Sequence, residues 1–396
     1  MRSFPLRAPR LRILHLFANW KWTGPAEPAL NVAWQQSREH EVLFVSGSAP
    51  EGQVSRILPH VAARAVATRE GLRLSKHARL LANRQDVARL VELLREFRPD
   101  IVHCHLDNDH RIGAAAVARA GVGRLVRTAY DVDGLRCTLR LRLVARRALH
   151  GLIVVTRGAE QATLRAWGGE PGALRVDAHA VPLTIIEGGV DLARFDPARL
   201  DRAAARARLG LEPGHVAVGV VARVQGHRRF DILIEALARL AARRPELRLV
   251  VIGRGTRIDE LLLTPVRERG LQGALVAPGY LSGDDYPSAL CALDACLYLV
   301  PGSDGTCRAL RELMACGLAA VVSPRPPLPE IVEDGVAGLV VEESARGLEQ
   351  GLERLAADAA LRERLRQGAR DAALRRFDLR RQAAAVTHFY EQVLGR

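Results

Sequence analysis

The sequence lacks the features that mark metal-binding, disulfide-stabilised and membrane-spanning proteins. None of its six cysteines forms a Cys-x-x-Cys pair, which excludes zinc-ribbon and thioredoxin-like sites and fits free thiols in a reducing compartment. No apolar run reaches the ~18 residues that a membrane-spanning helix needs. The short apolar stretch after the N-terminal arginines has no small-residue cleavage site. We therefore expect a cytoplasmic protein that does not cross a membrane.

Aromatic residues are also scarce, at 4% of the chain, and they form no stripe with basic residues. The net charge of +14 would permit nucleic-acid binding. However, the sequence has neither a recognised nucleic-acid motif nor the aromatic side chains on which bases stack. No nucleic-acid partner is therefore expected.

Lysine is nearly absent: only Lys21 and Lys76 occur among the 58 lysines and arginines. Residues 1–195 hold 29 basic residues against 18 acidic ones, whereas the rest of the chain holds 29 against 26. This asymmetry bears on the choice of partners and not on the fold. It predicts that the N-terminal half meets an anionic partner.

With 396 residues, 48% of them apolar, the chain has the size of about two globular domains. Short apolar runs alternate with longer amphipathic segments, which is typical of α/β proteins with parallel sheets covered on both faces. The series restarts at residue 215, so we predict two doubly wound, Rossmann-like domains facing a central crevice. The expected strands are residues 11–17, 41–45, 100–105, 124–128, 152–155, 215–221, 247–252, 274–277, 295–300 and 319–322, and helices are expected at 77–97, 230–243, 309–316 and from 344 onward.

Two arginines flank a loop at the carboxyl end of the strand expected at residues 215–221. Arg223 and Arg228 lie five positions apart, just before a helix that starts near Arg229. Two guanidinium groups at this place would grip a diphosphate in bidentate fashion. The alternative interpretation is a solvated basic loop.

A second candidate site follows the strand expected at residues 295–300, where a Pro-Gly-Ser-Asp turn leads into a helix near Thr306. Free amides and the positive dipole end at a helix N-terminus suit anionic or hydroxyl-rich ligands. Asp304 and Glu312, eight positions apart, would offer carboxylates to sugar hydroxyls. The alternative has Asp304 as a helix cap and Glu312 as a solvated helix residue.

Together these two motifs resemble the retaining glycosyltransferases of family 4, which have the GT-B fold. The family shows an arginine, a lysine five residues later and then Gly-Phe-Asp, where this chain has Arg223, Arg228 and Arg229-Phe230-Asp231. It also shows a glutamate, seven residues and then Glu-Ala-Met-Ala-Cys-Gly, where this chain has Asp304 and the run from Glu312 to Gly317.

Further segments match the family in the expected order. Residues 330–339 follow its Glu-Ile-Val-Glu-Asp-Gly-Val-Asn-Gly segment, and residues 186–195 follow the segment between its domains. Residues 99–105 match its Pro-Asp-Val-Val-His-x-His strand, and Gly24 lies where the family has a glycine-rich loop. The ordered set spans about residues 11–340, which makes the resemblance specific.

The resemblance implies a role for individual residues. Arg223 and Arg228 would hold the donor's diphosphate and stabilise the charge that develops as it leaves. The implied catalytic set is Arg223, Arg228, Asp304 and His105. The implied donor- and sugar-binding set is Glu312 for the ribose, Gly305, Thr306 and Cys307 for sugar hydroxyls, Tyr280 beside the base, and Gly24 with His105 on the acceptor and sugar side.

The resemblance also implies the domain plan and the chemistry. Residues 1–195 would bind the acceptor, residues 196–375 would bind the nucleotide sugar, and a helix at 376–396 would cross back to the N-terminal domain. Retention in the family is explained by a front-face path in which the departing phosphate helps to deprotonate the acceptor. No protein nucleophile, metal or other cofactor is then required.

Several positions depart from the family pattern. Arg228 replaces a lysine, and Asp304 replaces a glutamate with a side chain one methylene longer. Gly188 replaces an asparagine, and Tyr130-Asp131 stands where many members have His-Asp. These departures leave two alternatives open, because a fold match does not establish an activity. One is a GT-B pseudoenzyme that binds a sugar nucleotide without turnover, and the other is a GT-B sugar-nucleotide epimerase.

The segment at residues 136–147 carries five arginines among leucines and valines, with no acidic residue between Asp133 and Glu160. Such a segment is compatible with an interfacial helix attracted to anionic lipid. It is equally compatible with a solvated helix whose apolar face lies in the core. The five arginines are Arg136, Arg140, Arg142, Arg146 and Arg147.

Two other patterns point to different chemistry. His103 and His105 would lie on one face of a strand near Asp107 and Asp109, but no fixed tetrahedral metal set is evident. Gly253-Arg254-Gly255 is half of a dinucleotide fingerprint without its third glycine, and it fits a tight turn after a strand. Neither pattern outweighs the ordered match to the glycosyltransferases.

The sequence therefore predicts a metal-independent, retaining glycosyltransferase. It would move a sugar from a nucleotide-diphosphate donor to a glycan or glycolipid acceptor, on the inner face of the plasma membrane. Synthesis of lipopolysaccharide or another bacterial envelope polysaccharide is the expected pathway.

Overall fold

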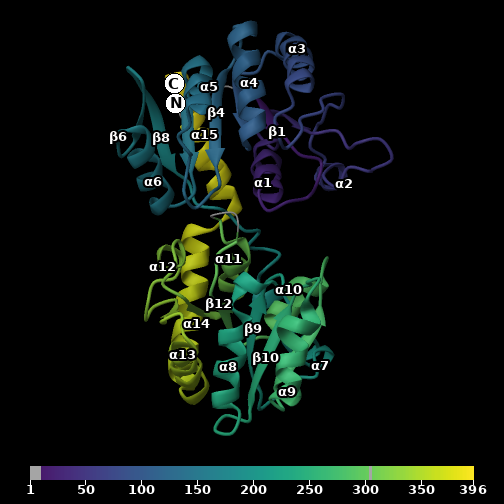
Figure 1. Ribbon diagram of the computed structural model, residues 1–396, viewed down its shortest axis with the longest axis vertical. Helices are drawn as coiled ribbons and strands as arrows, with labels where there is room; N and C mark the ends of the chain where they lie inside the picture. Colours follow the sequence, from purple (N-terminus) through teal and green to yellow (C-terminus); the bar gives the residue numbers. More distant parts are fainter. Residues whose placement is uncertain (1–9, 303–305) are drawn as a thin grey trace, which may run out of the picture. The chain divides into compact units, whose positions relative to one another are not determined.

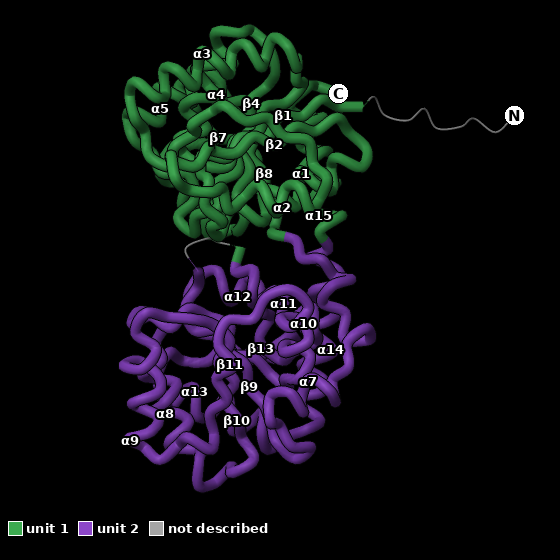
Figure 2. The backbone as a smooth tube through the Cα atoms, turned by 90° about the vertical axis from the view of Figure 1, so that its right-hand side faces the viewer, with its two compact units in different colours: residues 1–188, 303–306, 379–396 green, residues 189–302, 307–378 purple. Residues whose placement is uncertain are grey.

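The computed structural model describes residues 10–302 and 306–396, so Asp304 and Gly305 lie outside the described residues. The chain divides into two compact units (Figure 2). Unit 1 takes the chain up to Gly188, Thr306 and the final residues 379–396, and unit 2 takes residues 189–302 and 307–378. The chain thus leaves unit 1, builds unit 2 and returns to unit 1 with its last helix.

Unit 1 is built on a sheet of order β2-β1-β3-β4-β5-β8-β7-β6, in which the pairs from β2 to β8 are parallel. Its strands are β1 (Arg12–Phe17), β2 (Glu41–Ser46), β3 (Ile101–Cys104), β4 (Arg124–Ala129), β5 (Gly151–Val154), β6 (Gly169–Glu170), β7 (Ala173–Val176) and β8 (His179–Ile185). Its helices are α1 (Ala26–Gln36), α2 (Leu58–Ala63), α3 (Leu80–Phe97), α4 (Asp107–Ala120), α5 (Leu139–Ala148), α6 (Arg157–Trp167) and α15 (Leu379–Leu394).

Unit 2 has a parallel sheet of order β11-β10-β9-β12-β13-β14. Its strands are β9 (Val216–Val221), β10 (Leu247–Ile252), β11 (Leu275–Gly279), β12 (Ala295–Tyr298), β13 (Ala319–Val322) and β14 (Gly338–Val340). Its helices are α7 (Arg202–Arg208), α8 (Phe230–Leu240), α9 (Thr264–Glu268), α10 (Asp285–Cys291), α11 (Arg308–Ala315), α12 (Leu328–Ile331), α13 (Ala345–Ala357) and α14 (Ala359–Arg376) (Figure 1).

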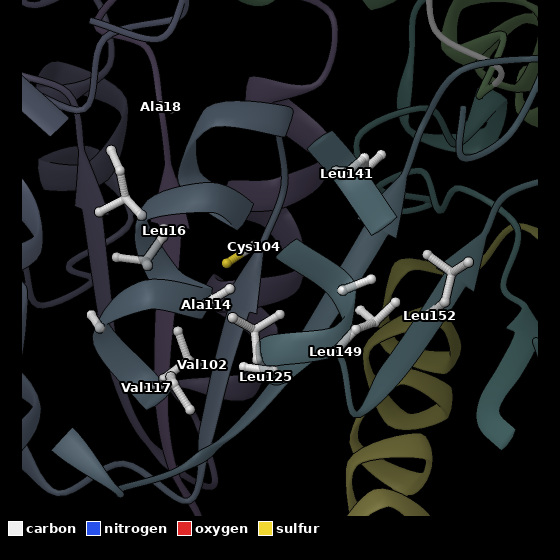
Figure 3. Packing of buried hydrophobic residues seen from close by; sticks show 14 of the residues in the cluster. Leu16, Ala18, Val102, Cys104, Ala114, Val117, Leu125, Leu141, Leu149 and Leu152 are labelled. Atoms are coloured by element: carbon white, nitrogen blue, oxygen red, sulfur yellow. The ribbon is translucent and has the colours of Figure 1, made fainter. Parts of the chain in front are cut away.

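Nearly continuous apolar strands explain why both sheets are covered on both faces. In unit 1, one face packs against α4 and α5 through residues such as Leu16, Leu125 and Leu152 (Figure 3). The other face, with Ile13 and Val126, packs against α1 and α15. The predicted fold, two doubly wound α/β sheets, is therefore confirmed.

The last helix, α15, lies directly on the sheet of unit 1. A Cβ on Gly151 of β5 would come within 2.7 Å of Val393 Cγ2 and 2.9 Å of Phe389 Cε1. Phe389 and Tyr390 are almost fully buried there. Glycine at position 151 is thus required by the close approach of the helix.

The observed elements differ from the predicted ones mainly at the edges of the sheets. Strands at 247–252 and 319–322 have the predicted bounds, and most others differ by one or two residues. The antiparallel ribbon β6-β7-β8 and the edge strand β14 were not expected. The two residues of β6 are exposed, β8 has exposed residues at its start, and β14 is only three residues long, so these segments give a weak signal for a buried strand.

Candidate functional site

The strand order places a topological switch point in unit 2 between β9 and β12. From β9 the chain proceeds through α8 to β10 on one side, whereas β12 lies on the other side of β9. Ligands of open α/β sheets bind at the carboxyl ends of the strands at such a point. The loop that carries Arg223 and Arg228 follows β9 directly, and residues 299–302 follow β12.

Arg228 bridges the two loops at this switch point. Its Nη1 donates to the carbonyl oxygens of Val300 at 2.6 Å and Pro301 at 3.1 Å. Its Nε is buried and has no hydrogen-bond partner among the described residues. A guanidinium anchored in this way keeps its plane fixed while further N–H groups remain available for an anion.

Arg223 lies in the same loop, and its side chain is exposed. No partner for it occurs among the residues that the structure describes. The following cation, Arg229, is instead committed to protein contacts, because it pairs with Asp231 at 3.1 Å and Glu343 at 3.0 Å. Of the three arginines in this loop, Arg223 and Arg228 are thus the two suited to a ligand.

Arg229 also adopts a left-handed backbone conformation, with φ of 59°. The family pattern has glycine at this position, and glycine adopts such a φ without strain. The two ion pairs of Arg229 hold the residue in that conformation at the start of α8. The replacement of glycine by Arg229 is therefore compatible with the turn that the family pattern requires.

The Gly253-Arg254-Gly255 turn packs against the arginine loop, which accounts for its glycines. Val224 N donates to Arg254 O at 3.1 Å, and Gly253 N donates to Gly279 O at 2.9 Å. A Cβ at Gly253 would overlap Ala222 O, and one at Gly255 would overlap Val224 O. The turn thus braces the loops after β9 and β11 and is not a dinucleotide fingerprint.

Cys307 lies at the N-cap of helix α11, has φ of 42° and is buried. One turn later, Glu312 is only 4% exposed, which contradicts the alternative of a solvated helix residue. Its Oε2 accepts a hydrogen bond from the Tyr286 hydroxyl at 2.7 Å, and its Oε1 lies 3.6 Å from Arg308 Nε. Burial beside the Glu312 carboxylate holds the pKa of Tyr286 well above its usual value.

The other predicted residues of the donor site lie near these loops or outside the described residues. Tyr280 follows β11 and is 64% exposed, with the Arg254 guanidinium 4.9 Å from its ring centroid. Thr306 is buried, at 3% exposed. Asp304 and Gly305, predicted to contact the sugar, lie outside the described residues.

In unit 1 the corresponding switch point lies between β1 and β3. Gly24 is exposed in the loop after β1, whereas His105, just after β3, is 1% exposed. The buried carboxylate of Asp109 joins these loops, because it accepts from Ala18 N at 2.9 Å and Leu106 N at 2.8 Å. Burial raises the pKa of Asp109 to about 7, although Arg127 acts against this shift.

Three buried histidines lie together behind this edge: His15, His103 and His105. Their nearest ring nitrogens are all within 4.8 Å of one another, a spacing compatible with a metal ion. However, each of the six ring nitrogens already has a hydrogen-bond partner. Their chemistry is therefore that of a satisfied buried network, and the donor set does not call for a metal.

Helix α5 carries four of the five arginines predicted to face lipid. Leu141, Ala145 and Ala148 are buried against the unit 1 core, whereas Leu139 is 78% and Leu143 49% exposed. Arg146 pairs with Asp177 at 2.7 Å, and Arg142 Nε donates to Cys137 Sγ at 3.1 Å. The exposed side thus combines apolar and basic side chains. Among the described residues, no helix has the length and apolar character to cross a bilayer.

Tyr286 was missed by the sequence reasoning, as was the bridging role of Arg228. Tyr286 lies on α10, 26 residues before Glu312, and no spacing rule links the two positions. Within unit 2, the structure brings Arg228, the loop after β12 and the braced turn at Gly253 together at one edge of the sheet.

Comparison with known proteins agrees with this architecture. Residues 29–194 match the sequence profile described as Glycosyltransferase Family 4, and residues 201–372 match that described as Glycosyl transferases group 1. The chain is 33% identical over 293 residues to D-inositol 3-phosphate glycosyltransferase of Salinispora arenicola. That match covers 68% of this chain and 64% of the relative, so the chain spans less than two thirds of the relative's length.

Solved structures share the fold. A glycosyltransferase from Rickettsia africae has a TM-score of 0.81 at 16% identity, covering 98% of this chain and 99% of that one. Anabaena Alr3699/HepE in complex with UDP has a TM-score of 0.79 at 19% identity, covering 96% and 100%. With two consecutive profile matches that together span most of its length on a GT-B fold, the chain belongs to the glycosyltransferases of family 4.

Proposed function

We propose that this protein is a retaining glycosyltransferase that moves a sugar from a nucleotide-diphosphate sugar to an anionic glycan or glycolipid acceptor. The observation that carries the proposal is the anchored guanidinium of Arg228 beside exposed Arg223 at the switch point of unit 2. Two cations at the carboxyl ends of parallel strands suit a diphosphate. The buried Glu312 carboxylate, oriented by Tyr286, suits the hydroxyls of a ribose.

The chemistry assigned to these residues is electrostatic. The bond between the anomeric carbon and the diphosphate oxygen breaks, and negative charge grows on the leaving diphosphate. Arg223 and Arg228 stabilise that charge. The acceptor hydroxyl forms the new bond on the same face of the sugar, and its proton goes to the leaving phosphate. Neither a metal ion nor a protein nucleophile takes part in this scheme.

The acceptor class follows from the charge of the N-terminal half. Residues 1–195 hold 29 basic and 18 acidic residues, which favours a phosphorylated or otherwise anionic acceptor. The name of the Salinispora relative makes D-inositol 3-phosphate the first soluble acceptor to test. Glycolipids and envelope glycans carrying phosphate, including lipopolysaccharide precursors, are the membrane-borne members of the same class.

The donor site is tested by titrating UDP-, GDP-, ADP- and dTDP-sugars and following the thermal unfolding midpoint. UDP-sugars come first because HepE binds UDP. We expect saturable stabilisation by one nucleotide series, lost in Arg228→Ala. Arg239→Ala is the matched control, because the ion pairs of Arg239 among the described residues are with Glu235 and Glu349, at partly exposed positions. No stabilisation by any series would refute the donor site.

Turnover separates the transferase from its alternatives. With the identified donor, release of nucleoside diphosphate that increases on adding an anionic acceptor supports transfer, and the anomeric configuration of the product tests retention. Binding without turnover would indicate a pseudoenzyme, whereas interconversion of the sugar nucleotide without an acceptor would indicate an epimerase. The same rates in EDTA would support the absence of a metal requirement.

The exposed leucines of α5 favour a peripheral position on an anionic membrane. Leu139 and Leu143 stand beside arginines on one exposed side, which combines apolar insertion with attraction to lipid phosphates. We expect binding to vesicles containing anionic lipid that weakens with salt and drops when Arg136, Arg140, Arg142, Arg146 and Arg147 are changed to glutamine. The control is a variant that loses the same amount of charge elsewhere. In it, the five exposed arginines of α14 and α15 are changed to glutamine: Arg364, Arg375, Arg376, Arg380 and Arg381.

A further inference from the structure

One fully buried carboxylate, that of Asp109, joins the two loops that flank the switch point of unit 1. Its Oδ2 accepts a hydrogen bond from Ala18 N at 2.9 Å, in the loop that follows β1. Its two oxygens lie 2.8 and 3.0 Å from Leu106 N, in the loop that follows β3. Both loops leave the carboxyl ends of their strands, where ligands of such sheets bind.

Only one of these contacts serves the helix to which Asp109 belongs. Asp109 is the third residue of α4, so its bond to Leu106 N caps the start of that helix. The bond to Ala18 N reaches 91 positions back along the chain and contributes nothing to the cap. A helix cap works equally well at the surface, whereas burial of a charged group is costly. The burial of Asp109 therefore calls for a second role.

Arg127 of β4 supplies the opposite charge. Its Nη1 lies 3.6 Å from Asp109 Oδ1, and its side chain is 5% exposed. Burial raises the pKa of Asp109 to about 7, although Arg127 and the amides of Ala18 and Leu106 act against this shift. The carboxylate is thus mainly ionised above pH 7 and mainly neutral below it.

Other ionisable groups surround this pair. Cys104 of β3 donates from Sγ to Asp109 O at 3.5 Å, and burial raises the pKa of its thiol well above the usual value. His110 of α4 stays neutral, because burial lowers its pKa to about 3. Asp107 and Asp131 are more exposed carboxylates that share Arg127 with Asp109. A substitution at Asp109 itself is therefore needed to isolate its contribution.

We propose that Asp109 is a positioning residue for the acceptor, and that its ionised carboxylate holds the loop after β1 against the loop after β3. Asp109 is fully buried, so it acts through these loops and does not touch the acceptor. The loop after β1 exposes Lys21 and Gly24. A cation held in one place binds an anionic acceptor at a lower entropic cost than a mobile one. This inference rests on the proposed function, because it takes unit 1 as the acceptor-binding unit.

Asp109→Asn separates the contact between the loops from the helix cap. Asparagine has one acceptor oxygen, and an NH2 group in place of Oδ1 would face both Leu106 N and the Arg127 cation. The oxygen is therefore expected at that position, where it keeps the cap. The NH2 group then faces Ala18 N, donor against donor, and the contact between the loops is lost.

The first experiment needs no substrate. Backbone hydrogen exchange at pH 8 is compared by mass spectrometry in wild type and Asp109→Asn, and we expect faster exchange in residues 18–25 with little change in α4. Asp294→Asn is the matched control, because that carboxylate also accepts from a backbone amide, Ala217 N at 2.8 Å, and pairs with Arg206 at 3.1 Å. It lies at the amino edge of the unit 2 sheet. Equal exchange in residues 18–25 of wild type and Asp109→Asn would overturn the inference, whether or not the protein transfers sugar.

The second experiment measures KM for both substrates at pH 8. We expect the acceptor KM to rise about 10-fold in Asp109→Asn, as for the loss of one weak hydrogen bond to a charged group. The nucleotide Kd should stay at the wild-type value, because the donor site lies in unit 2. A merely structural role would lower the amount of folded enzyme without raising the KM of one substrate. An unchanged acceptor KM, or an equal rise in Asp294→Asn, would refute the inference. Absence of nucleotide binding in wild type would instead refute the proposed function, and the exchange experiment would still decide whether Asp109 joins the loops.

The third experiment varies the pH between 6 and 8. As the pH falls through about 7, wild-type Asp109 takes up a proton and comes to resemble asparagine. The acceptor KM of Asp109→Asn divided by that of wild type should therefore fall toward 1. An acceptor phosphate, with a second pKa of about 6, titrates equally in both measurements. Exchange of residues 18–25 in wild type, corrected for the intrinsic rate, should increase over the same range, which tests the inference even where the variant does not fold. A constant KM ratio, or constant protection of that loop, would show that the charge of Asp109 does not hold the loops.

Discussion

The Tyr286 hydroxyl donates to the Glu312 carboxylate across 2.7 Å, from one helix of unit 2 to another. Tyr286 is itself fixed by an edge-to-face contact with Phe195, with ring centroids 5.9 Å apart. The carboxylate is therefore held in one orientation by a ring that cannot move without disturbing the core. This orientation is what a ribose would meet, if Glu312 binds it as the family resemblance implies.

Removing the Tyr286 hydroxyl should weaken nucleotide binding less than removing the charge of Glu312. In Tyr286→Phe the carboxylate remains but loses its neutral donor, so we expect Kd for the nucleotide to rise a few-fold. In Glu312→Gln the charged acceptor is lost, and hydrogen bonds to charged groups contribute about 1.5–3 kcal/mol, which corresponds to a Kd roughly 10- to 100-fold higher. Calorimetric titration checks both, with Glu235→Gln, at a partly exposed position, as the control. Equal affinities in all variants would remove Glu312 from the site.

Arg228→Lys should separate charge from geometry. Lysine has the charge that the family pattern prefers, but it cannot span two carbonyl oxygens and a phosphate with a planar fork. Because Arg228 Nη1 bonds both Val300 O and Pro301 O, we expect weaker tethering of the loop after β12 and a partial loss of donor affinity. Kd should lie between wild type and Arg228→Ala. Affinity at the level of Arg228→Ala would show that the bidentate geometry, and not the charge, is needed.

Gly253→Ala should distort the arginine loop. The added Cβ would overlap the carbonyl oxygen of Ala222, and a backbone atom cannot move away as a flexible side chain does. Overpacking of this kind costs about 1–3 kcal/mol. We expect a lower unfolding midpoint and weaker nucleotide binding. Gly214→Ala is the matched control, since nothing lies within 4 Å of its Cβ position. An unchanged midpoint in Gly253→Ala would contradict the described packing.

The buried histidines should make the protein sensitive to mild acid. Burial lowers the pKa of His15 to about 4 from an ordinary value of 6.5. Between these values the unfolded chain binds the proton more tightly, so the stability that neutral His15 contributes is present above about pH 6.5 and is lost as pH falls toward 4. The shift corresponds to about 3 kcal/mol. Asp109, whose pKa burial raises to about 7, acts in the opposite direction over part of this range.

Urea unfolding between pH 4.5 and 7.5 measures this effect. The decrease in the free energy of unfolding toward acid should be smaller in His15→Gln than in wild type, because the variant has no ring to protonate when it unfolds. His179→Gln, at an exposed position, should leave the pH dependence unchanged. Parallel pH profiles for wild type and His15→Gln would contradict the burial of a neutral ring.

The strands and loops that periodicity and local motifs encode could be predicted from the sequence. Contacts between residues far apart in the chain could not. The strand at 247–252 is apolar except for Arg248, and the Arg223–Arg228 loop follows a buried strand, so both were predictable. The partner of Glu312 comes from another helix. His15 is bonded to Gln36, and Gln36 in turn is bonded to Thr387, which lies 351 residues further along the chain. Such contacts arise from the order of the strands, and they cannot be predicted from the spacing of residues in the sequence.

His105 illustrates the difference. Its place after β3 was predicted, and so was its position near the edge of the sheet. The burial of both ring nitrogens was not, because it depends on Tyr130 and His15, which neighbouring strands bring alongside. The resemblance thus located the residue, and only the structure shows that both ring nitrogens of His105 are hydrogen-bonded within the protein.

The return of α15 to unit 1 also bears on how the nascent chain matures. The sheet face formed by Ile13, Val126 and Ile153 is completed by Phe389 and Tyr390, which are translated after the whole of unit 2. Until then the nascent chain exposes part of that apolar face to water and to chaperones. A truncation that removes residues 379–396 would therefore damage the half of the molecule that was made first.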